Sequence, residues 1–160
     1  GTVGREIAQE WPDVDMVLAP IGGGGLASGV AACIKRMLPA TKVIGVEPEG
    51  AASMRLALDR GSPKLLANME TIADGLAPVI TGQLTFEHAR DLIDDVVTAS
   101  DETIRSATLQ LIEHQKLIVE YSGAATIAAL LAEKVNVQGQ RVAAVVSGGN
   151  LDSAILAKLV

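Results

Sequence analysis

Short aliphatic runs alternate with segments of helical periodicity along the whole chain, and this alternation limits the folds that the chain can adopt. Four nearly continuous apolar runs predict buried strands, the last of which runs into a glycine turn: 14–20, 42–48, 95–100 and 141–150. Helical periodicity predicts helices over 26–38, 50–61, 85–93, 102–115 and 123–134. Because apolar strands separated by helices are typical of a parallel sheet covered on both faces, we expect a doubly wound α/β fold. Ligands of such folds bind at the carboxyl ends of the strands.

Composition places the chain among globular proteins and argues against several partners. The 160 residues are enough for one domain, and aromatic residues make up only 2%, so the core must consist of Ala, Val, Ile and Leu. The net charge of −6, without a cluster of Lys and Arg, disfavours nucleic acid and anionic membranes as partners. A single cysteine, Cys33, excludes an internal disulfide and makes a cytoplasmic location the default expectation. No apolar run is long enough for a membrane span, and the opening "GTVGREIAQEW", without Met, suggests a piece of a longer protein.

Four consecutive glycines, Gly22 to Gly25, lie between the first predicted strand and the first predicted helix. Glycine lets the backbone approach a ligand closely, and the amino end of the following helix favours an anion, so a phosphate is the expected guest. A tight turn without any ligand is the plainer alternative. A dinucleotide site is another alternative, since Gly22, Gly24 and Ala27 satisfy G-x-G-x-x-A and Glu47 lies at the end of the next strand. A second glycine turn, "SGGN" over 147–150, follows the last predicted strand.

Five motifs occur in an order and spacing that resemble one family: "PIGGGGLASG", "VEPEGAAS", "TIADGLAP", "VEYSGAA" and "VVSGGN". The sequence resembles the carboxy-terminal half of threonine dehydratases and serine racemases, which are pyridoxal-phosphate enzymes of the tryptophan-synthase-β-like fold. The resemblance covers essentially all of the chain. It implies that residues 1–160 form a single α/β cofactor-binding domain, the large-domain part of that fold, which lacks the amino-terminal half bearing the catalytic lysine.

The resemblance also implies roles for individual residues. In this family, the backbone amides of a glycine loop hold the cofactor phosphate, and the matching loop here consists of Gly22, Gly23, Gly24, Gly25 and Leu26. The resemblance further implies that Ser147 hydrogen-bonds the pyridine nitrogen and that Gly75 lines the cofactor ring. Glu120 is expected close to the same pocket, although Tyr121 stands where the family often has proline. A hydroxyl at Ser147 can meet a neutral pyridine nitrogen, whereas a carboxylate would hold that nitrogen protonated.

A divalent cation is a further expectation from the resemblance. Glu47 and Ala51 match positions that supply a side-chain carboxylate and a backbone carbonyl to Mg²⁺ or Ca²⁺ in metal-binding members. The third position is Ser53, where those members have aspartate, so the set of ligands lacks one carboxylate.

The function implied for the full-length parent is β-elimination from L-threonine or L-serine, with release of a 2-keto acid and ammonia. Serine racemase chemistry of the same family is the alternative, and an NAD-binding module or a non-catalytic remnant are alternatives of other classes. None of the chain's lysines lies in a Ser-x-Lys-x-Arg-like motif, so the chain alone is expected to be inactive. A small amino acid is the expected substrate, and a homo-oligomer, dimer or tetramer, is the expected assembly of the full-length enzyme.

Overall fold

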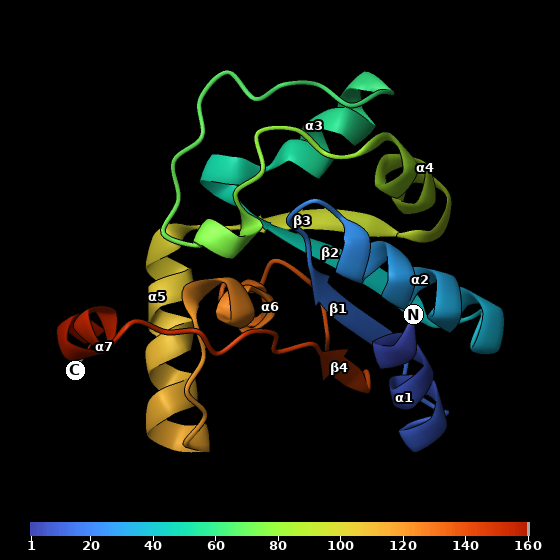
Figure 1. The fold of residues 1–160 in the computed structure, drawn as a ribbon. Helices are drawn as coiled ribbons and strands as arrows, with labels where there is room; N and C mark the ends of the chain where they lie inside the picture. Colours follow the sequence, from blue (N-terminus) through green and yellow to red (C-terminus); the bar gives the residue numbers. More distant parts are fainter. Residues whose placement is uncertain (160) are drawn as a thin grey trace.

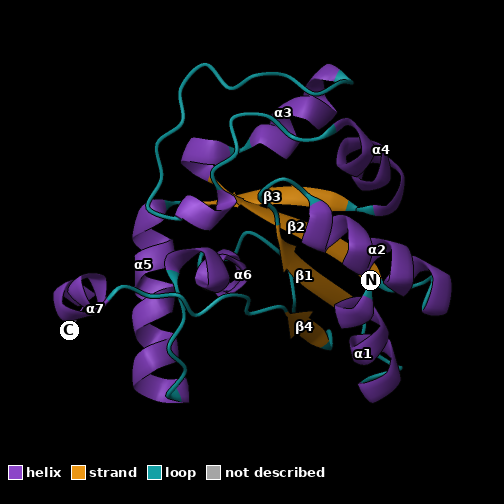
Figure 2. Cartoon of the chain, in the orientation of Figure 1, coloured by secondary structure: helices purple, strands orange, loops and turns teal. Residues whose placement is uncertain are grey.

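A four-stranded parallel sheet forms the centre of the computed structural model, which describes residues 1–159 (Figure 1). Its strands lie in the order β3-β2-β1-β4 and span Met16–Pro20 (β1), Lys42–Pro48 (β2), Asp95–Ala99 (β3) and Val142–Ala144 (β4). Figure 2 shows helices on both sides of this sheet. The predicted doubly wound α/β fold is therefore confirmed.

The two faces of the sheet have separate cores because successive side chains of a strand point to opposite faces. On one face, Met16 and Leu18 of β1 pack in a cluster with α5 and α6, which span Asp101–Gln110 and Tyr121–Leu131. On the other face, Val17 and Ala19 pack in two clusters with four helices: α1 (Thr2–Glu10), α2 (Gly25–Met37), α3 (Ser53–Arg60) and α4 (Gln83–Leu92). A last helix, α7, spans Ser153–Leu159. No helix in the part of the chain that the structure describes is long and apolar enough to cross a membrane.

Several element boundaries differ from those predicted. The helix expected over 102–115 ends at Gln110 and continues as a π-helical turn, which Lys116 closes with a φ of 59°. Periodicity cannot distinguish these states, because an α-helix and one π turn present nearly the same apolar spacing. The strand expected over 141–150 forms a strand only over Val142–Ala144, which pairs in register with Met16–Leu18 of β1, and the segment after Val145 leaves the sheet. Ser100 caps the amino end of α5, since its hydroxyl accepts a hydrogen bond from the Thr103 amide at 3.3 Å.

Parallel pairing brings two glycine turns together. Because β1 and β4 are neighbours and run in the same direction, the loop after Pro20 and the turn after Ala144 leave the sheet at the same edge. A short 3₁₀ turn, Asp74–Leu76, lies against the first loop, since a Cβ added to Gly22 would lie 2.9 Å from the Gly75 carbonyl oxygen. The amino end of α6 completes this corner of the molecule (Figure 1).

Candidate functional site

A pocket of about 240 Å³ lies at the carboxyl ends of β1 and β4. We call it the carboxyl-end pocket, and it is lined by Pro20, Gly22, Gly23, Gly24, Gly25, Leu26, Gly75, Leu76, Glu120, Ser122 and Ser147. All the residues that the sequence predicted for a cofactor are in this lining, although they come from three separate segments of the chain. Glu120 is also there, as expected.

The four glycines of the loop differ in what surrounds them. Gly24 has a φ of 91°, and a Cβ added there would lie 2.8 Å from Met54 Cε and 2.9 Å from Thr85 Cβ. The fold itself therefore requires glycine at this position. At Gly23 and Gly25, in contrast, an added Cβ would meet nothing within 4 Å, and both residues are exposed. Packing does not explain these two glycines, and the open space beside them leaves room for a ligand to approach the backbone closely.

The amino end of α2 opens onto the same pocket. Its cap is Gly24, so no side chain accepts a hydrogen bond from the first amides of the helix. These amides and the positive end of the helix dipole favour an anion. The loop is held from behind, because the Thr85 hydroxyl donates to the Gly23 carbonyl oxygen at 2.7 Å.

The opposite wall is built by the turn after β4 and the start of α6. The Glu120 carboxylate accepts a hydrogen bond from the Asn150 amide at 3.0 Å, and the Ser147 amide donates to the Gly123 carbonyl oxygen at 3.4 Å. A Cβ added to Gly148 or Gly123 would collide with Glu120 or with the Ser147 carbonyl oxygen, respectively. Glycines at these two positions therefore let the "SGGN" turn lie directly on α6, which places Ser147 in the pocket.

Sequence reasoning missed one residue of this wall, Ser122. Ser122 is one of the residues that line the pocket, it is 3% exposed, and its buried hydroxyl has no hydrogen-bond partner among the described residues. The only sequence feature that could have identified Ser122 as a pocket residue is its place in the motif "VEYSGAA", between Glu120 and Gly123. A sequence motif does not show where a hydroxyl lies.

Glu47, the acid of the dinucleotide alternative, lies inside the protein. Glu47 is 0% exposed, and its two carboxylate oxygens accept hydrogen bonds from the Met54 and Arg55 amides at 2.7 and 2.8 Å. Burial raises the pKa of this carboxyl from 4.5 to about 7, and the Met54 and Arg55 amides oppose that rise. An acid that binds a ribose must face the crevice at the strand ends. The position of Glu47 therefore argues against a dinucleotide site.

The predicted cation ligands do not fit a divalent metal. Glu47 serves as a cap for the amino end of α3, where the helix dipole already supplies positive charge. Ala51 and Ser53 are fully buried, and the Ser53 hydroxyl has no hydrogen-bond partner among the residues that the structure describes. Mg²⁺ and Ca²⁺ require several oxygen ligands, preferably carboxylates, and the described residues contain no group of three or more His, Cys, Asp or Glu side chains suited to a metal. The expectation of Mg²⁺ or Ca²⁺ at Glu47, Ala51 and Ser53 is therefore not supported.

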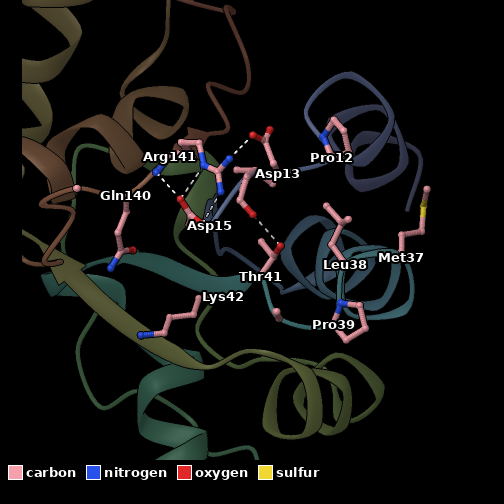
Figure 3. A pocket seen from close by; sticks show the side chains of 13 residues that line it. Pro12, Asp13, Asp15, Met37, Leu38, Pro39, Thr41, Lys42, Gln140 and Arg141 are labelled. Atoms are coloured by element: carbon pink, nitrogen blue, oxygen red, sulfur yellow. Dashed lines mark hydrogen bonds and ion pairs between the residues drawn. The ribbon is translucent and has the colours of Figure 1, made fainter.

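A larger cavity, of about 620 Å³, lies at the opposite, amino edge of the sheet (Figure 3). Its charged side chains are mostly paired with one another, since Arg141 forms ion pairs with Asp13 and Asp15. The hydrogen bonds that Arg141 donates to Asp15 lower the pKa of this carboxyl to about 2. The cavity contains none of the predicted site residues, so we place the functional site in the smaller carboxyl-end pocket.

Comparison with known proteins identifies the family of the chain. The sequence profile of the family described as "Pyridoxal-phosphate dependent enzyme" matches residues 1–148. The chain belongs to this family. Among relatives of the pyridoxal-phosphate dependent enzyme family, an L-threonine ammonia-lyase of Thermotoga maritima is 43% identical over 160 residues, which are all of this chain and 40% of that protein. The chain therefore spans less than half the length of this relative.

Solved structures of the pyridoxal-phosphate dependent enzyme family have the same fold. The processed form of threonine deaminase isoform 2 from Solanum lycopersicum superposes with a TM-score of 0.91 at 39% identity, covering 99% of this chain and 47% of that one. Maize serine racemase gives the same TM-score of 0.91 at 36% identity, covering 98% and 49%. The predicted resemblance and fold are confirmed. Family membership also supports pyridoxal phosphate as the cofactor.

Proposed function

We propose that this chain forms the phosphate- and ring-binding part of a pyridoxal-phosphate-dependent ammonia-lyase that acts on L-threonine or L-serine. The products are a 2-keto acid and ammonia. The observation that supports this proposal most strongly is the pair of open positions at Gly23 and Gly25, beside the uncapped amino end of α2. The similarity to threonine ammonia-lyases supports the choice of reaction.

The residues of the carboxyl-end pocket fit pyridoxal phosphate. In this proposal the amides of Gly22 to Gly25 and Leu26 bind the phosphate, and Gly75 lies against the ring. When bound, the cofactor withdraws electrons from the amino acid's α-carbon and so stabilises negative charge there. Ser147 binds the pyridine nitrogen through a hydroxyl, which leaves that nitrogen neutral. A neutral partner at Ser147 would not strengthen the electron withdrawal that the cofactor supplies, and this would suit loss of the β-hydroxyl.

We further propose that the lysine needed for catalysis comes from a part of the protein outside these 160 residues. No lysine whose side chain is described lines the carboxyl-end pocket. The chain covers 40% of the Thermotoga relative, which leaves room for a second half. In the resemblance-based proposal, residues 1–160 are one cofactor-binding domain of a cytoplasmic homo-oligomer, either a dimer or a tetramer.

Serine racemase is the second candidate, because maize serine racemase superposes as closely as threonine deaminase. The two activities differ in the fate of the substrate. The complete protein, loaded with pyridoxal phosphate, is expected to release 2-oxobutanoate from L-threonine and pyruvate from L-serine, whereas a racemase produces D-serine. Chiral chromatography of the L-serine reaction distinguishes them.

The cofactor proposal has its own test. Pyridoxal phosphate is expected to give the complete protein a visible absorption band and a higher melting temperature, and NAD is expected to do neither. Stabilisation by NAD alone would restore the dinucleotide hypothesis. Binding of neither ligand would favour the non-catalytic remnant.

A further inference from the structure

The Ser122 hydroxyl is buried without a partner, which is unusual for a polar group in a folded protein. The described part of the chain contains two other side-chain atoms of this kind, Ser53 Oγ and Gln140 Oε1, and neither residue lines the carboxyl-end pocket. Two buried threonine hydroxyls show the usual pairing. Thr126, one turn further along α6, donates to the Val145 carbonyl oxygen at 3.0 Å, and Thr108 donates to Ile104 at 2.9 Å.

The helix explains why Ser122 finds no local partner. A serine within a helix commonly bonds to the carbonyl oxygen four residues earlier. Ser122 is the second residue of α6, so the residue four positions before it, Ile118, lies outside the helix. The hydroxyl therefore has no acceptor within its own helix, and it belongs to a residue that lines the pocket.

Two neighbours define where this hydroxyl lies. A Cβ added to Gly75 would lie 2.9 Å from Ser122 Oγ, so the glycine leaves the space beside the hydroxyl open. On the other side, Gly123 carries the "SGGN" turn through its hydrogen bond with the Ser147 amide. Ser122 and Ser147 thus line the same pocket as the glycine loop, and they come from adjoining backbone segments.

We propose that Ser122 is a second hydroxyl ligand of the cofactor ring, beside Ser147. Its hydroxyl hydrogen-bonds a polar atom at the edge of the pyridine ring, while the glycine loop holds the phosphate. This inference rests on the proposed cofactor, since it concerns the same pocket. It explains both the unpartnered hydroxyl and the absence of a side chain at Gly75. Two neutral hydroxyls at one edge also bind the ring without requiring a proton on its nitrogen.

The test measures the binding of two probes to the complete protein after its cofactor has been removed. Pyridoxine 5′-phosphate has the ring and the phosphate but no aldehyde, so its affinity is independent of the catalytic lysine. Inorganic phosphate reports on the glycine loop alone. Ser122→Ala is expected to weaken the pyridoxine phosphate complex roughly 3- to 10-fold, the effect of one neutral hydrogen bond, and to leave phosphate binding unchanged.

Ser53→Ala is the matched control, because it deletes another buried and unpartnered hydroxyl, one that lies outside the pocket. Both alanine variants are expected to unfold at or above the wild-type temperature without ligand, but Ser53→Ala keeps the wild-type affinity for both probes. Ser122→Cys, which keeps the volume but donates weakly, is expected to behave like Ser122→Ala.

Unchanged affinity of Ser122→Ala for pyridoxine phosphate, in a protein that binds this probe, would overturn the inference. Equal losses for both probes would also overturn it, because they would indicate a disturbed loop. Failure of the wild-type protein to bind pyridoxine phosphate would instead reject the proposed cofactor, so the two failures are distinguishable.

Discussion

Replacing Gly25 with alanine separates what the fold needs from what the ligand needs. Gly25 is the first residue of α2, and a Cβ added there meets nothing within 4 Å. Alanine restricts the unfolded chain more than glycine does and is the better helix former. We therefore expect Gly25→Ala to raise the free energy of unfolding of the cofactor-free protein by about 0.5 kcal/mol.

The same methyl group would occupy the space that we assign to the phosphate. Hydrogen bonds to a charged group contribute roughly 1.5–3 kcal/mol each. Loss or lengthening of one of them is expected to weaken binding of pyridoxal phosphate by about 2 kcal/mol, or roughly 30-fold. Gly25→Ala should therefore stabilise the empty protein and weaken its complex.

Gly24→Ala is the matched control one residue earlier. Its φ of 91° and the short distances to Met54 and Thr85 predict strain and overpacking together. We expect a loss of stability of about 3 kcal/mol without ligand. Urea unfolding of both variants gives the stabilities, and titration followed by cofactor fluorescence gives the affinities. Wild-type affinity in Gly25→Ala, or a loss of stability as large as that of Gly24→Ala, would refute the reasoning.

Three further outcomes follow from single side chains. Because burial raises the pKa of Glu47 from 4.5 to about 7, the folded state binds its proton more tightly than the unfolded state. The stability that this group contributes is therefore present below pH 4.5 and is lost as the pH rises to about 7, by about 3 kcal/mol in all. In urea titrations across this range, the free energy of unfolding of Glu47→Gln should depend less on pH than that of the wild type. In Ser147→Asp, the new carboxylate is expected to hold the cofactor's ring nitrogen protonated and to slow the release of 2-oxobutanoate in a stopped assay. Ser147→Asn has a neutral side chain and should retain more activity. Equal rates in the two variants would contradict the role of charge. Ser100→Ala removes the cap of α5 and should lower the free energy of unfolding in urea by about 1 kcal/mol, without changing the affinity for the cofactor. A change in that affinity would contradict a purely structural role for Ser100.

The pattern of apolar residues was sufficient to predict the class of fold. Buried parallel strands need long runs of aliphatic residues, and their connecting helices need a different periodicity, so both are visible in the sequence. The glycine loop was also predictable as a ligand-binding candidate, because it follows a predicted strand, whereas Ser147 was singled out through the family resemblance. That they share one pocket depended on β4 lying beside β1, and no local pattern specifies that pairing.

The sequence by itself determined the kind of fold and the positions of the glycines. Only the tertiary structure decided which glycines the fold requires. A side chain at Gly24 would collide with Met54 and Thr85, which are distant in the sequence, whereas a side chain at Gly25 would meet open space. It likewise decided that Glu47 caps α3 inside the protein and that the Ser122 hydroxyl is unpartnered in the pocket. The physical reason is the same in each case. Propensity and periodicity describe a residue's neighbours along the chain, whereas burial, collision and hydrogen bonding depend on residues that are distant in sequence.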